Sequence, residues 1–154
     1  MTGMIDARLA ELGLTLPDAP APAANYIPYV IAGDLVFVSG QIPIGPDGLQ
    51  TGIVGQDVTT EQAAGAAKLC GLALIAQLRS ACGGDLDRVQ QVVKLTGFVN
   101  AVPGYGDQPE VVNGCSDLMV AVFGDAGRHA RAAVGAGSLP RNVQVEIEGV
   151  FRIG

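Results

Sequence analysis

The sequence predicts an α+β domain in which helices pack against one face of a β-sheet. Three observations support this prediction. Two long segments combine helix caps with nearly continuous small and apolar residues. Four other segments are rich in β-branched residues or alternate apolar with polar positions, as strands do. A chain of 154 residues is long enough for one domain with a sizeable core.

The helices are predicted from their caps. Residues 59–62, Thr-Thr-Glu-Gln, match the capping-box pattern, and the helix that follows is expected to end at Gly83-Gly84. Most of its circumference is Ala, Leu, Ile and Cys, so we expect it to be covered on more than one side. A second helix is predicted to begin at Asp107, with Pro109 at its first position, and to end near 124–127. A short helix over 4–13 and an extended, Pro- and Ala-rich arm over 17–28, lying on the domain, are expected to precede them.

The strands are predicted over 34–40, 89–100, 130–137 and 142–153, with a tight turn at 45–48. In the last strand the alternation divides the side chains between two faces. One face is expected to carry Val143, Val145, Ile147, Gly149 and Phe151, and the other Gln144, Glu146, Glu148 and Val150.

The composition excludes several classes of protein. The chain is 49% hydrophobic with a mean hydropathy of +0.37, but it contains no uninterrupted apolar run long enough to cross a membrane. We therefore expect part of the apolar surface to be hidden between subunits. The net charge of −6 and the scattered basic residues argue against nucleic-acid binding. The N-terminus lacks the pattern of a secretory signal, and the three cysteines, odd in number and without metal-ligand spacing, are interpreted as buried reduced thiols of a cytoplasmic protein.

Few residues could carry chemistry. No phosphate-binding loop, dinucleotide fingerprint or metal-ligand cluster is present. His129 is the only histidine and is interpreted as a solvated loop residue at the mouth of a strand. Arg131 begins an otherwise small and apolar strand, so it either extends to solvent or presents its guanidinium in a pocket, where it would suit a carboxylate. Glu146 and Glu148 share one strand face, which is either solvent-exposed or part of a site.

At these residues the chain resembles the reactive-intermediate deaminase (Rid) family, formerly called the endoribonuclease L-PSP family. The segment IPYVIAGDLVFVSGQIPIGPDG is similar to the family's Pro-Tyr and Ser-Gly-Gln-Ile-Pro signature. The capped helix and VVKLTGFV resemble its middle, and RAAVGAGSLPRNVQVEIEG resembles its closing signature. The resemblance covers roughly residues 26–154, which we interpret as a Rid-like domain preceded by a helix and arm over 1–25.

The resemblance implies a fold and an assembly. The fold is a mixed sheet with two helices on one face, similar to trimeric chorismate mutase. Three chains are expected to form a central barrel-like core, with active sites in the clefts between subunits. A homotrimer of this kind would explain why a strand face carrying Glu146 and Glu148 is not plain solvent-exposed surface.

The resemblance also implies site residues. Arg131 matches the arginine that holds the substrate carboxylate, and Glu146 matches the glutamate that holds or activates water. The pocket is expected to include further residues, with the backbone carbonyl of the last one orienting water: Tyr29, Ser39, Gly40, Asn113 and Ala133. The chain departs from well-known members at Ala132 and Ala133, where a Ser or Thr and then often a Cys stand.

The implied activity is hydrolysis of imines and enamines. Family members convert 2-aminoacrylate and 2-iminobutanoate (or 2-iminopropanoate) to 2-keto acids and ammonia, with no cofactor and no metal. The alternative is a non-catalytic trimer that uses the same arginine to bind a small carboxylate such as a 2-keto acid. An endoribonuclease, which the older family name suggests, is disfavoured by the acidic charge and the absence of a basic stripe.

Overall fold

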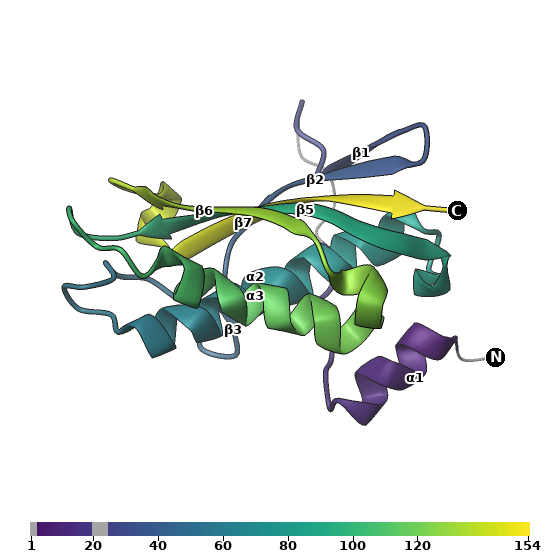
Figure 1. The fold of residues 1–154 in the computed structure, drawn as a ribbon, viewed down its shortest axis with the longest axis horizontal. Coiled ribbons are helices and arrows are strands. Elements are labelled where there is room, and N and C mark those ends of the chain that lie inside the picture. The colour runs from purple at the N-terminus through teal and green to yellow at the C-terminus, as the bar shows by residue number, and fades with distance from the viewer. Residues whose placement is uncertain (1–2, 20–24) are drawn as a thin grey trace.

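The computed structural model describes residues 3–19 and 25–154, which form a five-stranded sheet with two long helices on one of its faces (Figure 1). The strand order is β1-β2-β7-β5-β6. The sheet is mixed, because β5 and β6 are parallel whereas the other neighbours are antiparallel. The α+β class is therefore confirmed. The strand bounds are β1 Tyr29–Ala32, β2 Leu35–Gln41, β5 Val89–Asn100, β6 Ala130–Ala136 and β7 Val145–Ile153.

The two long helices begin close to where their caps predict. α2 spans Thr60–Ala81, and Thr59 forms the complete capping box with Gln62. α3 spans Gln108–Phe123, so Pro109 is its second residue rather than its first, and the Asp107 side chain makes no cap hydrogen bond. α2 packs against α3, β7 and β2, which confirms that it is covered on more than one side.

Glycines let α3 approach its neighbours closely. A Cβ on Gly114 would collide with the backbone carbonyl of Ala64 on α2. A Cβ on Gly97 of β5 would lie 2.5 Å from a methyl group of Val112 on α3. Because real Cβ atoms do not approach so closely, these two positions hold α3 against both α2 and the sheet. This packing fixes the face of α3 that lies beside β6.

The N-terminal helix is fastened to the domain by distant side chains. α1 spans Met4–Glu11, and the backbone N–H groups of Met4 and Ile5 donate to the Asp87 carboxylate at 2.9 and 2.8 Å. These two bonds, that from Ile5 foremost, lower the pKa of Asp87. Asp6 also forms an ion pair with Arg79 of α2. The domain boundary between residues 25 and 26 stays a prediction.

Short elements complete the chain. β3 (Ile44–Gly45) and β4 (Gly48–Leu49) form a two-residue hairpin at the predicted turn, and Gly48 has a φ of +102°. The 3₁₀ helices are η1 Leu86–Arg88, η2 Gly124–Gly127 and η3 Pro140–Asn142. The three cysteines are buried free thiols, as the sequence predicts. Residues 20–24 of the expected arm lie outside the described residues.

The face of the sheet opposite α2 and α3, here called the open face, is apolar in part. In β7 the buried residues alternate with more exposed ones, so Glu146, Glu148 and Val150 lie on the open face. Phe37 of β2 is paired with Val150, and it remains 46% exposed. Val134 of β6 is 43% exposed. No described element covers this face, and uncovered apolar area of this kind is typical of an interface.

Candidate functional site

Arg131 lies on the helix side of the sheet and is held by α3. Its Nη1 donates to Asn113 Oδ1 at 2.7 Å and to Ser116 Oγ at 3.2 Å. Asn113 and Ser116 are three residues apart, so they share one face of α3. We call this group, with His129, the arginine half-site. Arg131 is partly buried, and no described carboxylate forms an ion pair with it.

His129 belongs to the same network. Its Nδ1 lies 2.6 Å from the carbonyl oxygen of Gly127, and its Nε2 lies 2.9 Å from Ser116 Oγ. A carbonyl can only accept, so Nδ1 carries the proton, and the neutral ring accepts from the Ser116 hydroxyl through Nε2. Ser116 in turn accepts from Arg131. The expectation of a solvated side chain at His129 is therefore wrong: the ring is partly buried and orients Ser116.

Glu146 lies on the open face, beside Gly40. A Cβ built on Gly40 would lie 2.7 Å from Glu146 Oε2, so only glycine leaves room for the carboxylate as it stands. Burial raises the pKa of Glu146, and the nearby Glu148 raises it further. A carboxylate with a raised pKa is a better proton acceptor. We call Glu146 and Gly40 the glutamate half-site.

The structure separates the other predicted pocket residues. Ser39 Oγ donates to the carbonyl of Pro28 at 3.0 Å and lies 2.6 Å from the hydroxyl of Tyr26. Tyr29 instead turns to α2, where its hydroxyl lies 3.1 Å from Ser80 Oγ. Ala133 follows Arg131 on the same face of β6, partly buried against the core. The roles assigned to these residues stay predictions.

Within one chain the two half-sites do not meet. Arg131 is in register with Leu95 of β5, whereas Glu146 is in register with Phe98. Leu95 is buried under the helices, and Phe98, an odd number of residues away, points to the open face. The two side chains therefore lie on opposite faces, three residues apart along the strands and two strands apart across them. At normal spacings this is about 10 Å in each direction.

Two signals could have found what the sequence analysis missed. Ser116 stands three residues after Asn113, the spacing that places both on one helix face, so the two could have been considered together. Tyr26, which contacts Ser39, stands two residues before the Pro28-Tyr29 pair and carries no signal that separates it from other loop tyrosines.

Neither a metal centre nor a membrane helix is found in the described part of the chain. Within residues 3–19 and 25–154, no three His, Cys, Asp or Glu side chains gather closely enough to hold a metal ion. None of the helices described there has the length and apolar character needed to cross a membrane.

Comparison with known proteins agrees with this fold. Residues 6–148 match the family model described as "YjgF/chorismate_mutase-like, putative endoribonuclease". The chain is 44% identical to protein TCP17 of Trypanosoma cruzi, over 99% of this chain and 96% of TCP17. The crystal structure of protein Atu1372 from Agrobacterium tumefaciens, of unknown function, superposes with a TM-score of 0.91 at 48% identity, covering 97% of this chain and 92% of Atu1372.

Relatives with an assigned activity are more distant. The 2-iminobutanoate/2-iminopropanoate deaminase of Salmonella typhimurium is 29% identical, over 86% of this chain and 91% of the deaminase. The structure of Escherichia coli TdcF with bound serine superposes with a TM-score of 0.58 at 25% identity, covering 90% of this chain and 94% of TdcF. The chain therefore belongs to the YjgF/RutC family, also called Rid, which includes reactive-intermediate deaminases.

Proposed function

We propose that this protein hydrolyses small 2-imino acids and their enamine tautomers, such as 2-iminobutanoate and 2-aminoacrylate, to 2-keto acids and ammonia in the cytoplasm. The observation that carries the proposal is the arginine half-site. Arg131 is partly buried and held by two neutral side chains, with no described carboxylate paired to it. A guanidinium in this setting is suited to a carboxylate from outside the chain. The deaminase name of the Salmonella relative and the serine bound to TdcF support a small acid as that ligand.

The chemistry needs no covalent nucleophile or cofactor. An imine carbon is electrophilic, especially when its nitrogen is protonated, so a positioned water can attack it directly. Arg131 fixes the carboxylate and thereby places the C=N carbon, while Glu146 accepts the proton of the attacking water. The resulting carbinolamine expels ammonia and leaves the keto acid. A positioned general base of this kind typically contributes about 10²–10⁴-fold to the rate.

We further propose that the two half-sites meet between subunits of a homotrimer. Arg131 and Glu146 face opposite sides of one sheet, so one chain cannot bring both to one substrate. The partly apolar open face supports an assembly in which that face is covered. A head-to-tail contact would bring Arg131 of one chain to Glu146 of the next, and a ring closes such contacts.

Arg131→Ala tests the assigned activity. We expect the variant to lose measurable ammonia release from freshly generated 2-aminoacrylate, because both binding and positioning of the carboxylate depend on the guanidinium. Arg141→Ala is a matched control that removes an exposed arginine of η3. Wild-type ammonia release by Arg131→Ala would contradict the role. Tight binding of a 2-keto acid without any turnover by the wild type would favour the alternative, a carboxylate-binding protein.

Subunit mixing tests the shared site separately. Arg131→Ala and Glu146→Gln should each be inactive alone. After the two variants are unfolded and refolded together, some sites should combine Arg131 of one chain with Glu146 of another. With chains drawn at random, about a quarter of the sites should be restored. If each variant alone is inactive and the mixture is inactive as well, the site is not shared between chains.

A further inference from the structure

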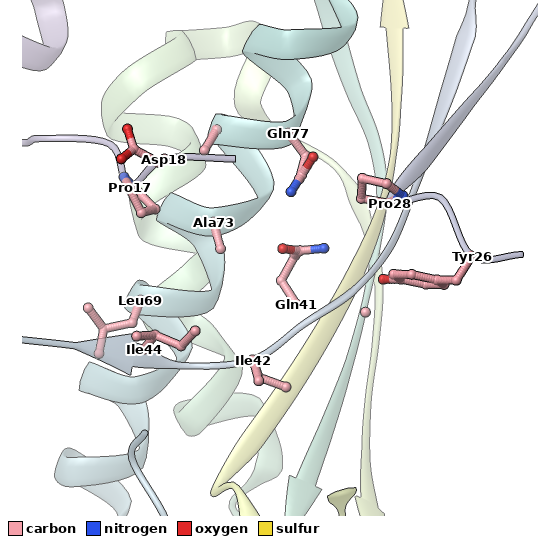
Figure 2. A pocket seen from close by; sticks show the side chains of 12 residues that line it. Pro17, Asp18, Tyr26, Pro28, Gln41, Ile42, Ile44, Leu69, Ala73 and Gln77 are labelled. Carbon is pink, nitrogen blue, oxygen red and sulfur yellow. The ribbon is translucent and has the colours of Figure 1, made fainter. Parts of the chain in front are cut away.

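A pocket of about 500 Å³ lies between α2 and the end of β2, away from both half-sites (Figure 2). Neither Arg131 nor Glu146 lines it. Gly40 is the one residue of the half-sites that borders it, through the strand segment that separates the pocket from Glu146. A volume of this size is typical of sites for small molecules.

Gln77 of α2 is the unusual residue of this pocket. Its side chain is buried, with 1% exposed, and neither Nε2 nor Oε1 forms a hydrogen bond with any of the described residues. Burying an amide without partners is costly, and buried polar groups are nearly always paired. Figure 2 shows the amide of Gln77 directed into the pocket, toward Gln41 on the opposite wall. Gln41 is itself held by a 3.1 Å bond from Nε2 to the carbonyl of Ser39.

The remaining walls determine which ligands fit. They are largely apolar, formed by α2, by the segment after β2 and by prolines, and no lysine or arginine lines them. The charged side chain among them is acidic, Asp18. An anionic ligand would therefore meet no cation and one carboxylate. This chemistry differs from that of the arginine half-site, so the pocket is not suited to an imino or keto acid. The apolar lining residues are Pro17, Pro28, Ile42, Ile44, Leu69, Ala73 and Ala76.

We propose that this pocket binds an uncharged, mostly apolar small molecule that carries one amide-type group. The N–H of that group donates to Gln77 Oε1 and its carbonyl accepts from Gln77 Nε2, which satisfies both orphan atoms at once. The apolar remainder fills the space between α2 and the strand wall. The proposal does not rest on the deaminase activity, because neither Arg131 nor Glu146 takes part.

The test uses the full-length, ¹⁵N-labelled protein and three neutral amides: acetanilide, benzamide and ε-caprolactam. Phenyl acetate keeps the shape of acetanilide but has no N–H, and benzoate carries a negative charge. The side-chain NH₂ signal of Gln77 is assigned by its absence from the Gln77→Leu variant. Gln56→Leu is the matched control, since Gln56 is exposed in a turn far along the chain from α2.

We expect at least one amide to shift the Gln77 signal saturably, with phenyl acetate weaker and benzoate without effect. Gln77→Leu should weaken that binding about tenfold or more, the equivalent of two ordinary hydrogen bonds, whereas Gln56→Leu should leave it unchanged. Without ligand, Gln77→Leu should unfold at a higher temperature, because an apolar side chain replaces an unpartnered amide. Gln77→Met serves if the leucine variant does not fold.

Four results would overturn the proposal. They are the absence of any shift of the Gln77 signal with all three amides, equal binding of phenyl acetate and acetanilide, unchanged affinity in Gln77→Leu, or a lower unfolding temperature of that variant. The last result would mean that the Gln77 amide already has partners in the free protein.

Discussion

Gly40→Ala separates the position of the Glu146 carboxylate from its charge. The new Cβ would lie 2.7 Å from Glu146 Oε2, 2.9 Å from Cδ and 3.0 Å from Cγ, whereas ordinary contact begins at 3.4 Å. The carboxylate must therefore move by about 0.7 Å, the difference between 3.4 and 2.7 Å. A misplacement of about 1 Å can cost 10²-fold in rate, so we expect kcat/KM for 2-aminoacrylate to fall about 10- to 100-fold.

The assay couples a serine dehydratase to the protein and follows imine decay together with ammonia release. Stability should fall by less than about 1 kcal/mol, because the displaced group is the end of a partly exposed side chain. Gly65→Ala is the control, since a Cβ at that position of α2 meets nothing within 4 Å. It should leave kcat/KM unchanged and stabilise the helix by about 1 kcal/mol. Wild-type kcat/KM in a folded Gly40→Ala protein would refute the role of Glu146.

Three further predictions concern pH and stability. Glu148→Gln removes one of the two causes that raise the pKa of Glu146, so the acid limb of the pH–rate profile should move to lower pH; a limb that stays or rises would contradict this. Asn100→Ala should destabilise the fold by about 2–4 kcal/mol in urea unfolding, because buried Asn100 Nδ2 donates to the carbonyls of Gly52 and Val143. The pKa of Asp87 is lowered below 3.8, so its stabilisation of α1 should persist above that value and disappear as pH falls through the folded pKa; hydrogen exchange of α1, compared with Asp87→Asn, measures this.

Much of the fold could be predicted because local signals and tertiary packing agree. Residues 89–100 were predicted as a strand and β5 spans Val89–Asn100, since β-branched residues are bounded there by turn residues. The capping box at Thr59 fixed the start of α2 for the same reason. β1 was not predicted, because Tyr29–Ala32 is short and three of its four residues are exposed, so it carries no periodic pattern.

The site was less predictable, because its geometry depends on contacts between distant segments. Arg131 could be recognised as an unusual charge, but its bond to Asn113 requires α3 to lie beside β6. Gln77 shows the opposite limit. A glutamine in a helix ordinarily faces solvent, and only the packing of α2 reveals that this one is buried without a described partner.

Placing Arg131 and Glu146 on opposite faces of one sheet has a consequence for the newly made chain. Under the proposed function, a single folded copy is inert, and turnover begins only when copies find one another. Specific activity should therefore fall on dilution, and a truncated or poisoned copy would silence its neighbours as well as itself. The protein's abundance, rather than a small-molecule signal, would then decide when the reaction is switched on.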